Sequence, residues 1–228
     1  MKITEKDIVS GIINDLKIDK LRKVNEAYVV SSQKFDYNVD IVGDKTKLAH
    51  QKLLNDYVDS LNKIAAELDT VNRDDANSTN SIYRSFKIDE VYNLNAAFLH
   101  GMFFENITES STITVDSLAF LRLERDFGSF DSWQKDFIAT AQSARSGWAV
   151  TVYNTFLRRY INVVVDSHAN NVPFSSYPVI VIDMWEHAYF DDYLNDKKKY
   201  IYAVMKQLDW QKINERFQRA EDIAEVFK

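Results

Sequence analysis

The spacing of hydrophobic and polar positions along the chain predicts that its first half is helical. Between residues 46 and 68, apolar side chains recur with the period of about 3.6 residues that is typical of an amphipathic helix. These apolar positions are Leu53, Leu54, Tyr57, Leu61, Ile64 and Leu68. Residues 71–80 are polar and turn-rich and interrupt this pattern, and a second helix is predicted over residues 81–105. Two such helices in succession predict a helical hairpin.

The second half of the chain has a different pattern. After an expected junction at residues 108–114, short helices are predicted over residues 115–127 and 129–143. Residues 148–153 and 160–165 are rich in β-branched and aromatic side chains and are separated by a polar turn, which indicates a β-hairpin. The apolar run at residues 178–183 predicts a third strand. Helices are then expected over residues 193–208 and 210–217.

These elements predict an α+β fold, in which an N-terminal α-helical hairpin is followed by helices around a small three-stranded antiparallel sheet. We expect an N-terminal extension or arm at residues 1–30, a hairpin domain at residues 31–110 and a C-terminal α/β domain at residues 111–228.

Composition and charge narrow the possible chemistry. The 228 residues include no cysteine and four histidines, so disulfides, thiolate metal sites and cysteine nucleophiles are excluded. The formal net charge of −6 argues against general nucleic-acid binding. The charged residues 1–7 lack the apolar core of a signal peptide, and the longest apolar run is too short to span a bilayer. We therefore expect a soluble intracellular protein without a membrane partner.

One short segment suggests a metal site. Asp183 ends the apolar third strand, and His187 follows four residues later. An aspartate and a histidine at this separation can bind one metal ion, and Trp185 between them could exclude solvent. The alternative is an ordinary Asp–His hydrogen bond at the end of a strand, and this segment alone does not decide between the two.

Residues 183–189 (DMWEHAY) resemble the Asp-x-Trp-Glu-His-Ala-Tyr signature of the iron/manganese superoxide dismutase family. Residues 127–133 (FGSFDSW) and 146–149 (SGWA) are similar to other motifs of that family in the same order, as are Leu208–Trp210 and Arg216 with Phe217. Residues 56–62 and 93–104 resemble its two helix motifs more weakly. The resemblance covers roughly residues 31–220 and is most specific in the C-terminal half.

The resemblance implies a single Fe or Mn ion held by three histidines and one aspartate. His100, Asp183 and His187 match three of these ligands. The fourth ligand, a histidine, is expected eight residues before the position of Tyr57, and Ala49 is found there.

Two alternatives exist for this missing ligand. His50 lies one position beyond Ala49, but a one-residue offset on a helix rotates a side chain by about 100°. That rotation favours a solvent-side or capping role for His50, with a ligand role as the alternative if the helix is irregular. A second alignment, through residues 35–38, places Asn38 at the ligand position instead.

The residues that surround such a site also depart from the family pattern. The gateway histidine, the closing tryptophan and the iron-type glutamine of the family are replaced by Leu53, Phe104 and Ala96.

The resemblance also gives roles to residues that do not bind the metal. It implies that Tyr57 is catalytic, together with Asn171 at the position of the manganese-type glutamine, or His168 as the alternative. Lys197 takes the place of a substrate-steering arginine, although a lysine-rich helix start is also commonly just solvated.

The dimer motif of the family is retained. The resemblance implies that Glu186 bridges to the ligand His187 of the other subunit, beside Tyr189. A symmetric homodimer is therefore expected.

These departures favour a degenerate metal site on a superoxide dismutase fold. The protein would then be a structural or interaction component of a large assembly, such as a virion or an organellar ribosome, rather than free in the cytoplasm. The alternative is an active Fe- or Mn-dependent superoxide dismutase with a remodelled first ligand. A third possibility is a metal enzyme of other chemistry that uses the three matched ligands.

Overall fold

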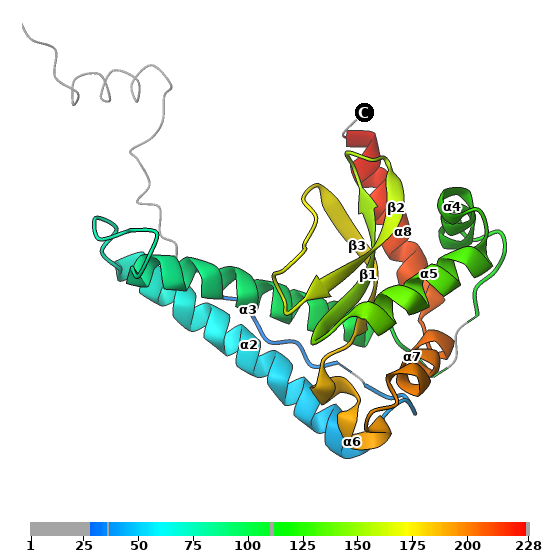
Figure 1. The fold of residues 1–228 in the computed structure, drawn as a ribbon, viewed down its shortest axis with the longest axis horizontal. Coiled ribbons are helices and arrows are strands. Elements are labelled where there is room, and N and C mark those ends of the chain that lie inside the picture. The colour runs from blue at the N-terminus through cyan, green and yellow to red at the C-terminus, as the bar shows by residue number, and fades with distance from the viewer. Residues whose placement is uncertain (1–27, 36, 110–111, 227–228) are drawn as a thin grey trace, which may run out of the picture.

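The computed structural model describes residues 28–35, 37–109 and 112–226 (Figure 1). Most of the expected N-terminal extension, residues 1–27, therefore lies outside the described residues.

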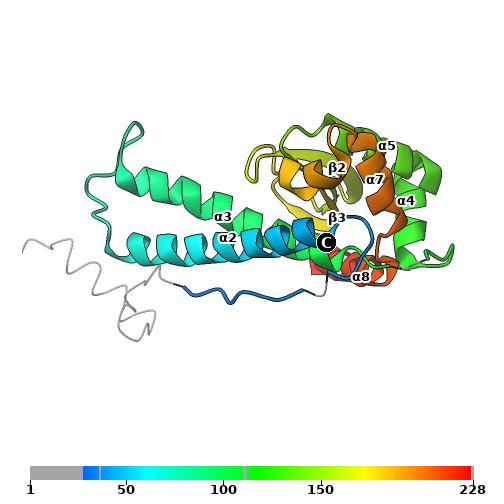
Figure 2. The same ribbon diagram turned by 90° about the horizontal axis from the view of Figure 1, so that it is seen from below.

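Two long helices form the hairpin that the periodicity predicts. Helix α2 spans Asp44–Thr70 and helix α3 spans Ile82–Glu105, and the two pack side by side (Figures 1 and 2). Helix α2 buries one face, at positions that include Leu54, Val58 and Leu61. Helix α3 begins at Ser81, whose side chain accepts a hydrogen bond from the backbone N–H of Arg84. Figure 2 shows the tip of the hairpin projecting away from the sheet.

An extended segment lies along α2. Val30 exchanges two hydrogen bonds with the side chain of Asn62, and the backbone N–H of Phe35 donates to Gln51. In Figure 2 this segment runs beneath α2 towards the start of that helix.

Three strands form an antiparallel sheet in the order β2-β1-β3, as expected. Strand β1 spans Gly147–Asn154, β2 spans Arg159–Asp166 and β3 spans Ser176–Asp183. The central strand β1 is buried along its whole length. The α+β fold prediction is confirmed by these elements.

Helices cover the sheet. Helix α4 spans Leu118–Phe127, α5 spans Phe130–Ser143, α7 spans Lys197–Lys206 and α8 spans Trp210–Val226. Helix α5 packs against β1 and β2, and α3 and α8 contact β3.

The helix predicted over residues 193–208 is wrong in its first turn. A 3₁₀ helix, Glu186–Ala188, and a single turn, α6 at Phe190–Tyr193, precede a break. Leu194 there has a φ of 51°, a conformation that a helix does not allow, and the side chain of Asp196 caps α7. Helix α8 also continues beyond the predicted end at Phe217, because Ala220 extends its buried face.

The hairpin and the sheet meet at the carboxyl end of β3. Helix α3 contacts β3, and α2 contacts the 3₁₀ helix that follows it. Within the described residues, none of the helices has the length and apolar character that crossing a membrane requires.

Candidate metal centre

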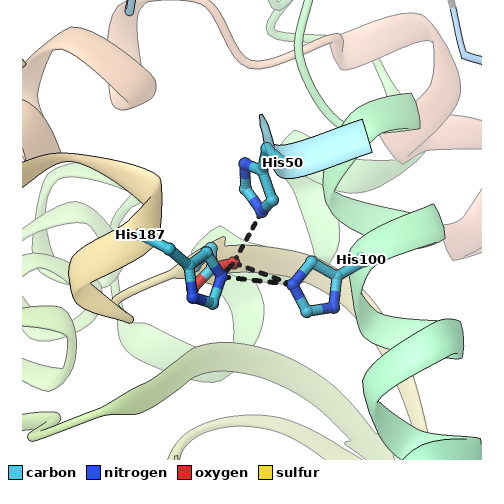
Figure 3. A group of neighbouring side chains, drawn as sticks. His50, His100 and His187 are labelled. Atoms are coloured by element: carbon cyan, nitrogen blue, oxygen red, sulfur yellow. Dashed lines mark hydrogen bonds and ion pairs between the residues drawn. The ribbon is translucent and has the colours of Figure 1, made fainter. Parts of the chain in front are cut away.

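Four side chains from four elements converge where the hairpin meets the sheet (Figure 3). His50 comes from α2, His100 from α3, Asp183 from the end of β3 and His187 from the 3₁₀ helix. One potential ligand atom from each lies within 4.8 Å of all the others. His50, His100 and Asp183 are buried, and His187 is partly exposed. The cluster therefore lies in the interior and opens to solvent on the side of His187.

The distances between these atoms fit a shared ion. Asp183 Oδ2 lies 3.1 Å from His50 Nε2, 3.3 Å from His187 Nε2 and 3.5 Å from His100 Nε2. His100 Nε2 and His187 Nε2 are 3.3 Å apart. Two atoms that each bind one ion at about 2.1 Å are separated by roughly 3.0–3.6 Å when the angle at the ion is about 90–120°. The residues present therefore fit a single metal ion.

Neighbouring hydrogen bonds orient two of the ligands. Asp183 Oδ1 accepts the backbone N–H of Trp185 at 2.8 Å, which leaves Oδ2 directed at the histidines. His100 Nδ1 donates to the carbonyl oxygen of Ala96 at 2.7 Å. A neutral imidazole that donates through Nδ1 presents the lone pair of Nε2, so His100 offers that lone pair to the cluster.

Three residues of the cluster, His50, His100 and Asp183, have the protonation states that metal binding requires. Burial lowers the pKa of His50, and it lowers the pKa of His100 to about 3. Burial alone would raise the pKa of Asp183, but the charge of His187 and hydrogen bonds from His187 and His50 hold that pKa well below its usual range. Neutral imidazoles and an ionised carboxylate are the forms that bind metals, and this donor set suits Fe and Mn.

The expectation that His50 lies on the solvent side is wrong. His50 is 1% exposed, whereas Ala49 and Asn38, the other two candidates, are both exposed. Helix α2 is continuous, and His50 lies seven residues before Tyr57. Residues seven apart on a regular helix differ by only about 20° in direction, so both side chains lie on the same face. The prediction had assumed that the eight-residue spacing of the family must hold here.

His168, and not Asn171, lies beside the cluster. Its ring is buried and lies 5.7 Å from the ring of His100, between centroids. Its Nδ1 accepts from Trp148 Nε1 at 3.0 Å, and its Nε2 lies 3.1 Å from the Tyr57 hydroxyl. Burial lowers the pKa of His168 to about 4, so the ring is neutral at physiological pH. Tyr57 and His168 therefore lie side by side next to His100.

The prediction that Asn171 lines the site is wrong. Asn171 is exposed and has a φ of 65°, in the loop between β2 and β3. The chain reverses direction between Ser167 and Asn171, which turns the asparagine to solvent. Sequence spacing made both Asn171 and His168 candidates, but it did not show which of the two side chains would be buried.

Aromatic rings surround the cluster and His168, and the sequence analysis did not single out two of them, Tyr37 and Tyr92. Tyr37 packs edge-on to His50, with 6.1 Å between ring centroids, and Tyr92 packs edge-on to His168 at 4.7 Å. Phe104, which replaces the family tryptophan, packs edge-on to His50 at 4.8 Å. Aromatic residues at these spacings are also common in ordinary cores, so the sequence carried no specific signal for Tyr37 or Tyr92.

Of the expected dimer and steering residues, Glu186, Tyr189 and Lys197 lie outside the cluster, whereas His187 belongs to it. The exposed carboxylate of Glu186 accepts from Ser146 Oγ at 3.0 Å, and Tyr189 is buried. Lys197 Nζ lies 5.9 Å from the centre of the Tyr189 ring and donates to the carbonyl oxygens of Ala144 and Arg145. The ammonium group is thus held at the end of α5 and not against the metal ligands.

Comparisons with known proteins agree with this geometry. Residues 118–216 match the family model of iron/manganese superoxide dismutases, C-terminal domain. The chain is 33% identical over 175 residues to the iron superoxide dismutase of Aquifex pyrophilus, a match that covers 75% of this chain and 82% of that protein.

Two archaeal proteins are also similar. The chain is 33% identical over 132 residues to manganese superoxide dismutase 1 of Halobacterium salinarum, which covers 58% of this chain and 66% of that protein. It is 31% identical over 134 residues to manganese superoxide dismutase 2 of Haloferax volcanii, which covers 59% of this chain and 67% of that protein.

Proposed function

This chain belongs to the iron/manganese superoxide dismutase family, and from this premise we propose that it is an active superoxide dismutase with a relocated first ligand. One Fe or Mn ion would be held by His50, His100, Asp183 and His187. The observation that carries the proposal is the position of His50, whose Nε2 lies 3.1 Å from Asp183 Oδ2.

A degenerate site is the weaker interpretation. Its main argument was a missing fourth ligand, and a buried histidine that faces the other three ligands removes that argument. Neither the described residues nor the comparisons support a role in a large assembly such as a virion or an organellar ribosome, so we do not propose one. The third possibility, a metal enzyme that uses only the three matched ligands, also loses its motivation.

Held by the four residues of the cluster, an Fe or Mn ion would supply the redox chemistry that converts two superoxide anions and two protons to O₂ and H₂O₂. The residues of the chain must deliver those protons and exclude bulk water. Tyr57 and His168 form a hydrogen-bonded pair beside His100 and are placed to hold a proton close to the site. Trp148 keeps the ring of His168 in place through its indole N–H.

Two residues outside the cluster, Lys197 and Glu186, have supporting roles in this proposal. Lys197 adds positive charge that attracts the anionic substrate, an effect that weakens as ionic strength rises. We also infer a two-fold dimer in which exposed Glu186 approaches His187 of the partner subunit.

Metal analysis combined with a superoxide assay tests the proposed function. The full chain is purified after expression with added Fe or Mn, its metal content is measured by mass spectrometry, and superoxide decay is followed by stopped-flow. We expect about one ion per chain and rapid decay with at least one of the two metals. Protein that takes up neither metal, or that binds metal without accelerating decay, would refute the proposal.

A further inference from the structure

Two residues on α3, Tyr92 and Asn95, contact the Tyr57–His168 pair. The Tyr92 ring packs edge-on to His168, with 4.7 Å between centroids, and edge-on to Tyr57 at 6.3 Å. One turn later, Asn95 Nδ2 donates to the backbone carbonyl of His168 at 2.9 Å. Helix α3 therefore holds the ring of His168 through Tyr92 and its backbone through Asn95.

The direction of the hydrogen bonds follows from their donors. An indole N–H can only donate, so His168 Nδ1 must accept the bond from Trp148. A neutral imidazole then carries its proton on Nε2, which donates to the Tyr57 oxygen at 3.1 Å. Because that oxygen already accepts, the proton of Tyr57 itself is free to point at another group.

These contacts also link the pair to the ligand cluster. Tyr57 belongs to α2 and His168 to the loop after β2, so no single element holds both. Helix α3 carries Tyr92 and Asn95 and, five residues after Asn95, the ligand His100. At about 100° per residue, these three positions lie within an arc of roughly 140° on the helix surface. A rigid helix therefore fixes the distance between the proton-holding pair and the ligands.

We propose that Tyr92, supported by Asn95, is a positioning residue that fixes the Tyr57 hydroxyl and the His168 imidazole in one hydrogen-bonded arrangement. This inference rests on the proposed function for its catalytic meaning, since Tyr92 acts through Tyr57 and His168. The arrangement itself is a property of the folded chain and is measurable without metal.

The test replaces Tyr92 by leucine in the full chain, which removes the ring that packs against His168 and Tyr57. The matched control is Tyr83→Leu, nine residues earlier on the same helix. The first readout is the solvent exchange of the His168 Nε2 proton, followed by NMR of ¹⁵N-histidine-labelled, metal-free protein. We expect exchange to accelerate about fivefold in Tyr92→Leu, the factor that corresponds to losing one aromatic pair, and to stay unchanged in the control.

The second readout uses metal-loaded protein. Tyr92→Leu should lower kcat for superoxide about fivefold through the same lost ring contacts, while metal content and KM remain those of the parent protein. A merely structural role would instead lower metal content or leave kcat unchanged.

Unchanged exchange of the His168 proton in Tyr92→Leu overturns the inference. If that variant does not fold, Asn95→Ala takes its place, with the same acceleration expected and the same result against it. Accelerated exchange in the variant, together with a parent protein that shows no superoxide decay, would support the positioning role and refute the proposed function, so the two failures are distinguishable.

Discussion

At the scale of single residues, the site depends on His50 and on the pair formed by His168 and Tyr57. His50 replaces a ligand that family spacing places at residue 49, because a regular helix turns residues seven apart to the same side. His168 is buried beside the cluster through two side-chain hydrogen bonds. Replacing either histidine would alter the chemistry of the site, so each replacement leads to a separate prediction.

Replacing His50 should remove most of the metal affinity. We expect His50→Ala to weaken Fe or Mn binding by more than the roughly 10–100-fold that is typical when a hydrogen bond to a ligand is lost. Dialysis against a graded series of chelators, followed by metal analysis, measures this. The control Ala49→Ser alters an exposed neighbour and should bind like the parent. The double variant Ala49→His with His50→Ala should not recover binding, because position 49 faces solvent; recovery would show that the helix register is different.

Replacing His168 should lower the free energy of unfolding through the loss of hydrogen bonds. In His168→Leu the indole N–H of buried Trp148 loses its acceptor, which costs about 1–3 kcal/mol of unfolding free energy. His168→Gln supplies both an acceptor for Trp148 and a donor for Tyr57, so it should recover most of that loss. Thermal and denaturant unfolding measure the difference. Equal stability of the two variants would mean that the hydrogen bonds contribute nothing.

At the scale of elements, close backbone packing at the start of β1 sets the geometry of the sheet. A Cβ at Gly147 would collide with the carbonyl oxygen of Val165 and lie 2.8 Å from Asp166 Cα. The backbone carbonyl of Gly147 also accepts from the N–H of Met184, one residue beyond the ligand Asp183. The absence of a side chain at this glycine therefore holds β2 and the end of β3 close to β1.

Two glycine substitutions should act in opposite directions. Gly147→Ala requires the backbone of β2 to move and should lower the free energy of unfolding by about 3 kcal/mol or more. Gly101→Ala is the matched control. Gly101 lies in helix α3, and the nearest atom to the added Cβ would be Phe35 Cζ at 3.5 Å, an ordinary van der Waals contact. That change should stabilise by about 0.5–1 kcal/mol through helix propensity. Denaturant titration of both variants checks the sign, and a neutral Gly147→Ala would contradict the packing argument.

At the scale of the whole molecule, the cluster joins the hairpin to the sheet. Its four residues come from α2, α3, β3 and the 3₁₀ helix, so the charges of the cluster affect how these parts stay together. Without metal, buried neutral histidines and an ionised aspartate must keep those states for the fold to persist. Stability of the metal-free protein should therefore depend on pH.

We expect that stability to decrease as pH falls below about 6.5. Burial lowers the pKa of His100 to about 3 and that of His168 to about 4, whereas the rings of the unfolded chain have the ordinary histidine pKa of 6.5. Between these values the unfolded chain binds more protons, so acid favours unfolding. Each histidine contributes a slope of up to about 1.4 kcal/mol per pH unit. Denaturant unfolding of the metal-free protein from pH 7 to pH 4.5 measures the slope, and His168→Gln should reduce it. A flat profile would show that these rings are not buried as neutral groups.

Much of the fold follows from local patterns. The two hairpin helices and the three strands are predictable because amphipathic periodicity reports directly on which face is buried. The sequence analysis missed the break at Leu194, although polar Asn195 and Asp196 follow it and Asp196 is the N-cap of α7. Asp183 and His187 are predictable as a pair because His187 is only the fourth residue after Asp183.

The sequence by itself determined the family, the α+β architecture and three of the four converging side chains, since motifs and short spacings depend on neighbouring residues. Only the tertiary structure decided that His50 joins Asp183, 133 residues away, and that His168 is buried where Asn171 was expected. The physical reason is that the direction of a side chain at a distant site depends on how whole elements pack against one another. A one-residue change in helix spacing or in loop conformation leaves the local pattern almost unaltered, yet it decides which atom reaches the site.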